Sequence, residues 1–245
     1  MKLKIATLAL LPILALQGKQ VKKNTPRLAE PIGERQGQCG QGHPLSILIV
    51  GDSAAAGVGV ATQDQALLGQ LLSCLEQDYE IEYVLEAKRG RTTLQLIKAI
   101  QNLAIRPFDV VISSIGVNDV TQLIQPQQWL QKQQKLYSII QHKFKPQLIL
   151  AASVPPLHLF PALPQPMAWL MGQYAKCMNQ YLCEYMEKQQ NMAVLSYNLA
   201  QYQAMNLQMA EDGFHPSEDI YQYWANNMAE HIRKKIPSRR SCLHQ

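Results

Sequence analysis

Short apolar runs alternate with longer segments of helical periodicity along most of the chain. Five apolar runs predict strands, at residues 46–50, 80–87, 109–115, 148–152 and 193–197. Between and after them, apolar residues recur every three or four positions and predict helices at residues 64–77, 94–100, 126–144, 167–189 and 217–236. Strands that alternate with helices predict an α/β fold, with a five-stranded parallel sheet that is covered by helices on both faces.

The first strand carries the clearest indication of a functional site. Its apolar run from Ile47 to Val50 has no polar alternation, which is typical of a strand buried on both faces. Gly51 ends the run, and Asp52 and Ser53 follow at the carboxyl end of the strand. Open α/β sheets bind their ligands at that edge. The alternative is that Asp52 and Ser53 only cap the helix that begins there.

The chain divides into four predicted segments. Residues 46–236 form the α/β domain, and a chain of 245 residues is long enough for one such domain with a substantial core. Residues 1–18 are an apolar N-terminal segment, residues 19–45 a basic linker rich in proline and glycine, and residues 237–245 a basic tail.

The formal net charge of +5 is located almost entirely outside the predicted domain. Residues 46–232 carry 11 basic and 16 acidic residues, whereas 12 of the 23 lysines and arginines lie on either side of this stretch. A nucleic-acid enzyme is expected to be basic around its site. The charge distribution therefore argues against a nucleic-acid partner and suits a membrane surface, or simple solubility, at the termini.

The N-terminal segment resembles a signal peptide, with an apolar run from Ile5 to Leu16 after two lysines. The run is too short to span a bilayer as a straight helix, and Pro12 interrupts it. More positive charge follows the run than precedes it, which opposes translocation of the rest of the chain. Five cysteines at no metal-ligand spacing also favour a reducing compartment. We therefore expect peripheral association with the cytoplasmic face of a membrane, with a periplasmic or secreted location as the alternative.

Polar residues that suit acyl transfer follow several of the predicted strands. Ser53 follows the first strand, and Asp212 and His215 follow the fifth. A serine hydroxyl needs a neighbouring base, and a histidine supplies it when a carboxylate fixes its tautomer. Hydrogen-bond donors must then stabilise the oxyanion. The expected donors are the backbone N–H groups of Ser53 and Gly90 and the side-chain amide of Asn118.

The residues alone leave several alternatives open. Asn118 and Asp119 could form a simple turn, and the apolar loop at residues 154–166 could either cover the core or form an acyl site with Leu157 and Phe160. A metal-dependent phosphoesterase could use Asp52, Asn118, Asp119, Asp212 and His215 as ligands. A domain that binds a small molecule without catalysis is the other alternative from a different class.

Four sequence blocks together resemble the SGNH (GDSL-type) hydrolase family. They are Gly51-Asp52-Ser53, Gly90 before Thr92-Thr93, Gly116-Val117-Asn118-Asp119 and Asp212-Gly213-Phe214-His215-Pro216, in the family's order and at suitable spacing. One departure is Ala54, where the family usually has leucine. The resemblance covers about residues 46–236.

The resemblance implies a three-layer flavodoxin-like fold with parallel strands in the order 2-1-3-4-5. It also implies Ser53 as nucleophile, His215 as base, Asp212 as its partner, and Gly90 and Asn118 as oxyanion donors, without a metal or other cofactor. The implied activities are those of an esterase, lipase, thioesterase or carbohydrate deacetylase. From the residues and the resemblance together, we predict a metal-independent serine esterase that acts on small or lipid-like acyl esters.

Overall fold

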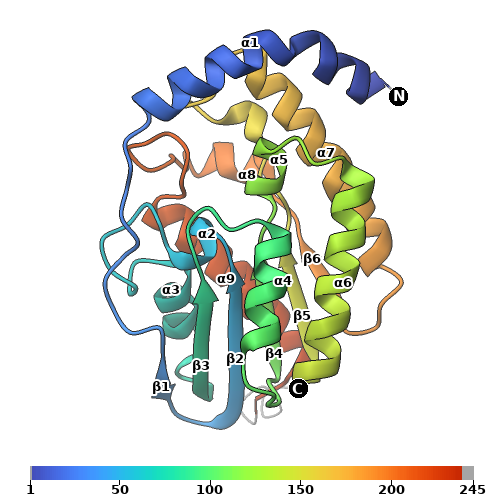
Figure 1. Cartoon of the computed structure of the whole chain (residues 1–245). Helices are drawn as coiled ribbons and strands as arrows, with labels where there is room; N and C mark the ends of the chain where they lie inside the picture. The colour runs from blue at the N-terminus through green and yellow to red at the C-terminus, as the bar shows by residue number, and fades with distance from the viewer. Residues whose placement is uncertain (1, 239–245) are drawn as a thin grey trace.

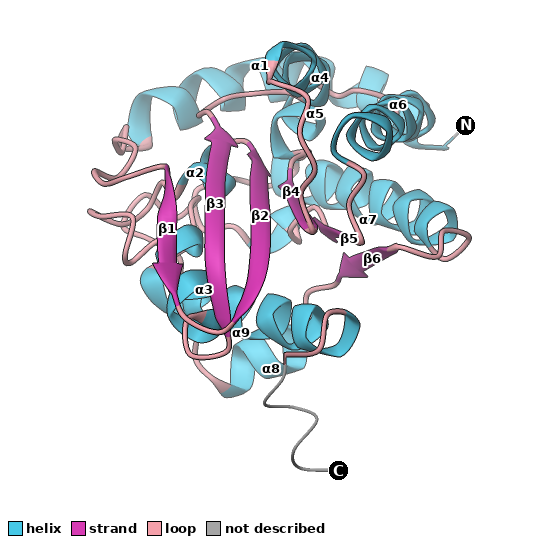
Figure 2. Cartoon of the chain, turned by 90° about the horizontal axis from the view of Figure 1, so that it is seen from below, coloured by secondary structure: helices cyan, strands magenta, loops and turns pink. Residues whose placement is uncertain are grey.

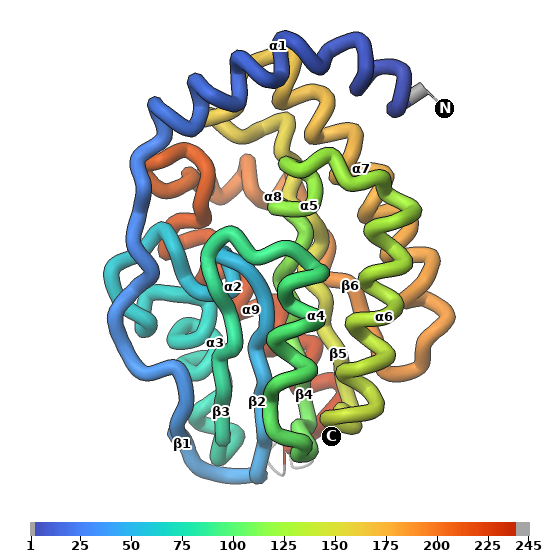
Figure 3. Tube along the Cα trace, in the orientation of Figure 1, coloured from blue at the N-terminus to red at the C-terminus, as the bar shows by residue number. Residues whose placement is uncertain are grey.

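A mixed β-sheet runs through the middle of the molecule (Figures 1 and 3). The structure is a computed structural model that describes residues 2–238. Within them the sheet has six strands in the order β1-β3-β2-β4-β5-β6. The strands are β1 (Gln36–Gly40), β2 (His43–Gly51), β3 (Tyr79–Ala87), β4 (Val110–Ser114), β5 (Leu148–Ala152) and β6 (Met192–Leu195). The five strands from β3 to β6 are parallel and have the predicted 2-1-3-4-5 order, so the predicted fold is confirmed.

Helices cover both faces of the sheet (Figure 2). One layer contains α4 (Thr93–Asn102), α6 (Pro126–Phe144) and α7 (Met167–Met186), and the other contains α3 (Leu67–Leu75) and α9 (Glu218–Lys235). Alternate residues of β2 face the two layers, because Leu48 and Val50 pack with the first group and Ile47 and Ile49 with the second. All four side chains are fully buried, as the unbroken apolar run predicts.

The sixth strand lies in the segment that the sequence places in the linker. β1 pairs antiparallel with β3 at the edge of the sheet, and β2 already begins at His43. The sequence of β1, Gln-Gly-Gln-Cys-Gly, contains one apolar residue and two glycines, so it carries no strand pattern of its own. Backbone pairing with the exposed edge of β3 forms this strand, and such pairing leaves little trace in side-chain pattern.

The N-terminal segment is a single long helix, α1 (Lys2–Asn24), which continues through Pro12. The boundary predicted at residue 18 therefore lies inside this helix. α1 packs on α7, where the Thr7 hydroxyl hydrogen-bonds the Tyr174 hydroxyl at 2.9 Å and Leu14 is buried. Among the described residues, no helix combines the length and hydropathy that are needed to span a membrane.

The remaining described elements are short and lie near the carboxyl ends of the parallel strands. They are α2 (Ser53–Ala56), α5 (Val117–Thr121), the 3₁₀ helix η1 (Leu157–Leu159) and α8 (Leu199–Ala204). Each follows the end of a strand within a few residues, so the topology brings these four segments together at one edge. The predicted basic tail at residues 237–245 lies almost wholly outside the described residues.

Candidate active site

Ser53 is held by a tight turn between β2 and α2. Gly51 comes so close to β4 that a Cβ atom there would lie 2.1 Å from the Ser114 carbonyl oxygen, which explains the glycine. Asp52 caps α2, because its Oδ1 accepts the Ala54 N–H at 3.1 Å. The capping alternative is therefore correct for Asp52. The Ser53 hydroxyl instead contacts a residue that is distant in sequence.

Asp212 and His215 form a hydrogen-bonded turn just before α9. Oδ1 of Asp212 accepts the backbone N–H groups of Phe214 and His215, both at 2.9 Å. Oδ2 lies 2.5 Å from Nδ1 of His215, and Nε2 of His215 lies 3.0 Å from Oγ of Ser53. A continuous chain of hydrogen bonds therefore joins the Asp212 carboxylate, the imidazole and the Ser53 hydroxyl.

The electrostatics of the turn determine which atoms donate and which accept in these hydrogen bonds. Burial acts to raise the pKa of Asp212, but hydrogen bonds from the His215 ring and from two backbone N–H groups outweigh it, so the pKa lies below its ordinary value. An ionised Asp212 only accepts hydrogen bonds, so Nδ1 of His215 carries the proton. Nε2 is then the acceptor for the Ser53 hydroxyl proton, as a general base requires.

Asn118 connects three of the loops at this edge. Its amide nitrogen donates to the Arg91 carbonyl at 3.0 Å and, over a longer 3.5 Å, to Oδ2 of Asp52. Its neighbour Asp119 is buried and accepts both the backbone N–H and the hydroxyl of Thr93, at 2.9 and 2.8 Å. These two side chains tie the loop after β4 to the loops after β2 and β3, which goes beyond a local turn.

Asp52 itself is unusual, because it is a buried carboxyl next to Ser53. Burial raises its pKa to about 7, the N–H of Ala54 acts against that rise, and the Asp119 carboxylate adds to it. Its side chain is thus partly protonated near neutral pH.

Gly90 lies in the exposed turn between β3 and α4, with a φ of +74°. The turn contacts Asn118 through the Arg91 carbonyl. Neither Gly90 nor Asn118 lines the cavity next to Ser53. The structure thus places the Asn118 side chain near Asp52, the residue before Ser53. The oxyanion roles of Gly90 and Asn118 remain predictions.

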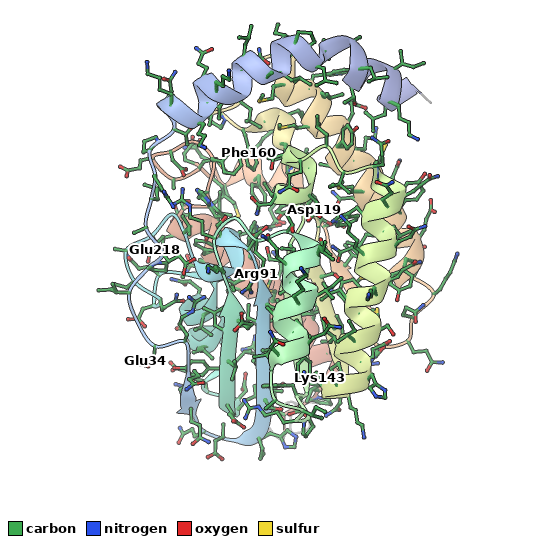
Figure 4. All side chains as sticks on the ribbon, in the orientation of Figure 1. Glu34, Arg91, Asp119, Lys143, Phe160 and Glu218 are labelled. Carbon is green, nitrogen blue, oxygen red and sulfur yellow. The ribbon has the colours of Figure 1, made fainter. Side chains whose placement is uncertain are left out.

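A mostly apolar cavity of about 350 Å³ opens beside Ser53 and His215. Its wall comes from the loops after β2, β4, β5 and β6 and from the start of α9. The apolar lining includes Ile115, Val117, Val154, Pro155, Pro156, Leu159, Phe160, Leu199, Leu207, Met209, Phe214, Ile220 and Trp224. Phe160 and Phe214 pack edge to face, with ring centroids 5.3 Å apart. Figure 4 labels Phe160 in the part of the molecule beneath α1.

The prediction for Leu157 is wrong. This side chain is fully buried in the core layer of α6 and α7, and it does not line the cavity. Leu159, two residues later, is 52% exposed and lines the cavity in its place. Successive side chains of a 3₁₀ helix point about 120° apart, so Leu157 and Leu159 of η1 face different sides, and the loop both covers the core and walls the cavity. Phe160 lines the cavity as predicted.

Sequence reasoning missed the contribution of α8 and the residues around it. Tyr197, Leu199, Tyr202 and Leu207 all line the cavity. Their spacing of two to five residues is a weak helical pattern, and α8 has only six residues. The side chain of Asn198 caps the helix by accepting the Gln201 N–H at 3.1 Å. This asparagine was the available indication of a helix start.

Within residues 2–238, no three histidine, cysteine, aspartate or glutamate side chains form a group that could hold a metal ion. Asp52 and Asp212 accept the hydrogen bonds described above, and Asp119 accepts its two through Oδ2 while its buried Oδ1 has no hydrogen-bond partner among the described residues. The donor set that a metal-dependent phosphoesterase would need is thus dispersed in the described part of the chain.

The sequence matches a known protein family. Residues 49–223 match the model of the GDSL-like Lipase/Acylhydrolase family. Among curated proteins, none matches the sequence.

Three solved structures illustrate the likeness in fold. A member of the lipolytic protein G-D-S-L family from Veillonella parvula has a TM-score of 0.59 at 16% identity, over 78% of this chain and 97% of that one. The lipase Lip_vut3 from a goat rumen metagenome has a TM-score of 0.58 at 17% identity, over 80% and 99%. The acetylxylan esterase Axe2 from Geobacillus stearothermophilus has a TM-score of 0.56 at 18% identity, over 80% and 95%. At these identities, the structures establish similarity of fold alone.

Proposed function

Because the chain belongs to the GDSL-like lipase/acylhydrolase family, we propose that it hydrolyses carboxylic esters through an acyl-enzyme on Ser53, without a metal. The observation that carries this proposal is the hydrogen-bonded chain from Asp212 through His215 to the Ser53 hydroxyl, with contacts of 2.5 and 3.0 Å. Those distances are short enough for direct proton transfer between the serine and the imidazole. The mostly apolar cavity beside the serine points to an acyl chain as the group that binds there.

The first half of the reaction acylates the serine. Oγ of Ser53 attacks the carbonyl carbon of the ester while its proton passes to Nε2 of His215. The imidazolium that forms is stabilised by the Asp212 carboxylate. When the tetrahedral intermediate collapses, the bond from carbon to the alcohol oxygen breaks, and His215 returns the proton to the departing alcohol.

The second half returns the enzyme to its starting state. A water molecule gives a proton to His215 and attacks the acyl carbon, and the bond to Oγ of Ser53 then breaks with return of that proton to the serine. Both tetrahedral intermediates carry an oxyanion, and the proposed donors are the N–H groups of Ser53 and Gly90 and the amide of Asn118. Ser53 is the first residue of α2, so its N–H has no acceptor within the helix.

The lining of the cavity favours medium acyl chains over acetyl groups on carbohydrate. Side chains such as Phe160, Leu207 and Met209 offer apolar contact along the cavity, which an acetyl group would leave largely unused. Carbohydrate deacetylation and thioester hydrolysis use the same serine chemistry, so the substrate panel must include both.

The test uses the full chain and a series of p-nitrophenyl esters from acetate to laurate, with an acetylated xylo-oligosaccharide and an acyl thioester beside them. We expect the highest kcat/KM on a medium-chain ester, no effect of EDTA, and labelling of one serine per chain by a fluorophosphonate. Ser53→Ala must abolish both turnover and labelling. The matched control is Ser73→Ala, because Ser73 is an exposed serine on α3.

Each contrary result has a defined meaning. Activity that survives Ser53→Ala removes the proposed nucleophile, and activity that EDTA abolishes replaces the mechanism with a metal-dependent one. A chain that neither turns over any ester nor reacts with the probe is a binding domain instead.

A further inference from the structure

The outer face of α1 is apolar although no described residue covers it. Ile5, Leu8, Leu11 and Leu16 are 59%, 69%, 46% and 68% exposed. A helix on the surface of a soluble domain normally turns a polar face to the solvent. α1 already uses a separate side, which includes Leu14, to pack on the domain. It therefore carries one apolar face toward the protein and a second apolar face with no partner.

Positive charge surrounds the second face at both of its ends. Lys4 lies before the apolar stretch, and Lys19, Lys22 and Lys23 follow it, all of them exposed. None of these four lysines forms an ion pair within the described part of the chain. The sequence contains no aspartate or glutamate before Glu30, so nothing on α1 offsets this charge.

We propose that this outer face binds the surface of an anionic lipid bilayer, with α1 lying parallel to the membrane plane. The exposed leucines and Ile5 would enter the boundary between headgroups and acyl chains, while the lysines contact lipid phosphates. One apolar segment combined with a cluster of basic residues is an arrangement that gives stable membrane anchoring. α1 need not cross the bilayer for this purpose.

Charge also distinguishes a bilayer from a second copy of this chain. If two α1 helices packed antiparallel through their outer faces, Lys4 of one would lie near Lys19, Lys22 and Lys23 of the other. No acidic residue on either helix would compensate for this repulsion. An anionic membrane satisfies both the apolar face and its charged ends.

The position of α1 gives this binding a consequence for the reaction, which rests on the function proposed above. α1 lies across the end of the molecule toward which β2 and β3 point their carboxyl ends (Figure 1). Gln17 of α1 donates to the Gln165 carbonyl at 2.6 Å and accepts the Met167 N–H at 3.2 Å. Gln165 lies in the loop that walls the cavity, and Met167 begins α7 directly after that loop. The bound protein therefore holds its acyl cavity near the lipid surface.

The test is flotation of the full chain with vesicles of phosphatidylcholine, alone or mixed with phosphatidylglycerol, at low and high salt. We expect binding to the anionic vesicles, weaker binding at high salt, and little binding to phosphatidylcholine alone. Leu8→Glu with Leu16→Glu should weaken binding by about tenfold or more for each leucine. Replacing Lys19, Lys22 and Lys23 by glutamine should weaken binding to anionic vesicles only.

The matched control is Ile105→Glu. Ile105 is 83% exposed and lies between α4 and β4. This loop is at the amino ends of the parallel strands, whereas Ser53 is at their carboxyl ends. This variant should bind vesicles like the wild type. All variants should hydrolyse a soluble ester at the wild-type rate, which checks folding independently of membrane binding.

Three results would overturn the proposal. The first is an absence of flotation with anionic vesicles. The second is flotation that Leu8→Glu with Leu16→Glu leaves unchanged. The third is a dimer in solution that this double variant dissociates, because the face would then be covered by a second copy. Loss of ester hydrolysis with intact flotation would refute the proposed function and leave this inference standing.

Discussion

Replacing Asp212 by asparagine tests the direction of proton transfer in the site. Oδ1 of Asp212 accepts two backbone N–H groups at 2.9 Å, and the asparagine oxygen must keep that place. The new NH₂ group then faces Nδ1 of His215 and donates to it. Nδ1 becomes an acceptor, so the imidazole proton moves to Nε2. Nε2 then points a proton at the Ser53 hydroxyl and cannot take one from it.

The expected loss follows from this change of tautomer. A histidine held in the wrong tautomer typically lowers kcat by about 10⁴, which corresponds to about 5.5 kcal/mol in the activation free energy. KM should change little because Asp212 does not line the cavity. The fold should survive, because both backbone hydrogen bonds remain and the loss is one charge-assisted bond of about 1.5–3 kcal/mol.

The assay measures kcat and KM on p-nitrophenyl butyrate, with the rate of fluorophosphonate labelling as a second readout. Asp219→Asn is the matched control. It is the same substitution at an exposed aspartate in the first turn of α9, outside the proposed site. A value of kcat within about tenfold of the wild type in Asp212→Asn would refute the tautomer argument. Equal losses in the two variants would do the same.

Three further predictions concern the cavity, the oxyanion and the buried carboxyl. Phe160→Ala should lower kcat/KM for octanoate more than for acetate, by about 1–3 kcal/mol, whereas Leu157→Ala should lower the melting temperature without changing this chain-length preference. Asn118→Ala should lower kcat by about 10²–10³ at nearly constant KM, and a loss of cooperative unfolding would instead mean a structural role. The pKa of Asp52 is raised to about 7, so the folded protein keeps a proton that the unfolded chain releases near pH 4. The free energy of unfolding should therefore fall by up to about 4 kcal/mol as the pH rises from about 4 to about 7. Urea unfolding across that range should show a flatter pH dependence in Asp52→Asn, and an unchanged slope would contradict this.

The elements that the sequence predicted well are those whose pattern is set by burial in the sheet. Ile47 to Val50 are all apolar because helices cover both faces, and the same run identifies a central strand. Once the strands alternate with helices, the position of Ser53 at a carboxyl end follows from chain order alone. The structure then places Asp212 and His215 beside it.

Other elements left no such pattern. β1 is defined by backbone pairing with β3, and its glycines and glutamines carry no strand preference. Pro12 suggested a break in the N-terminal run, yet α1 continues through it; Pro12 itself is exposed, while Thr7 and Leu14 on either side of it pack against the domain. Tertiary contacts decided both cases, and a single sequence does not display them.

Leu157 and Leu159 illustrate a difference between two kinds of prediction. The arrangement of the candidate catalytic residues follows from chain order, whereas the shape of the cavity depends on local loop geometry. Sequence order alone places Ser53 and His215 at one edge, because parallel strands and short loops leave few other arrangements. Which leucine faces the cavity depends instead on the rotation of one 3₁₀ turn, and the two residues differ from fully buried to 52% exposed. Under the proposed function, the serine chemistry can therefore stay constant while substitutions in residues 153–163 and 197–209 change the acyl group that fits. Exchange of those two loops between relatives should alter chain-length preference and leave labelling of Ser53 intact.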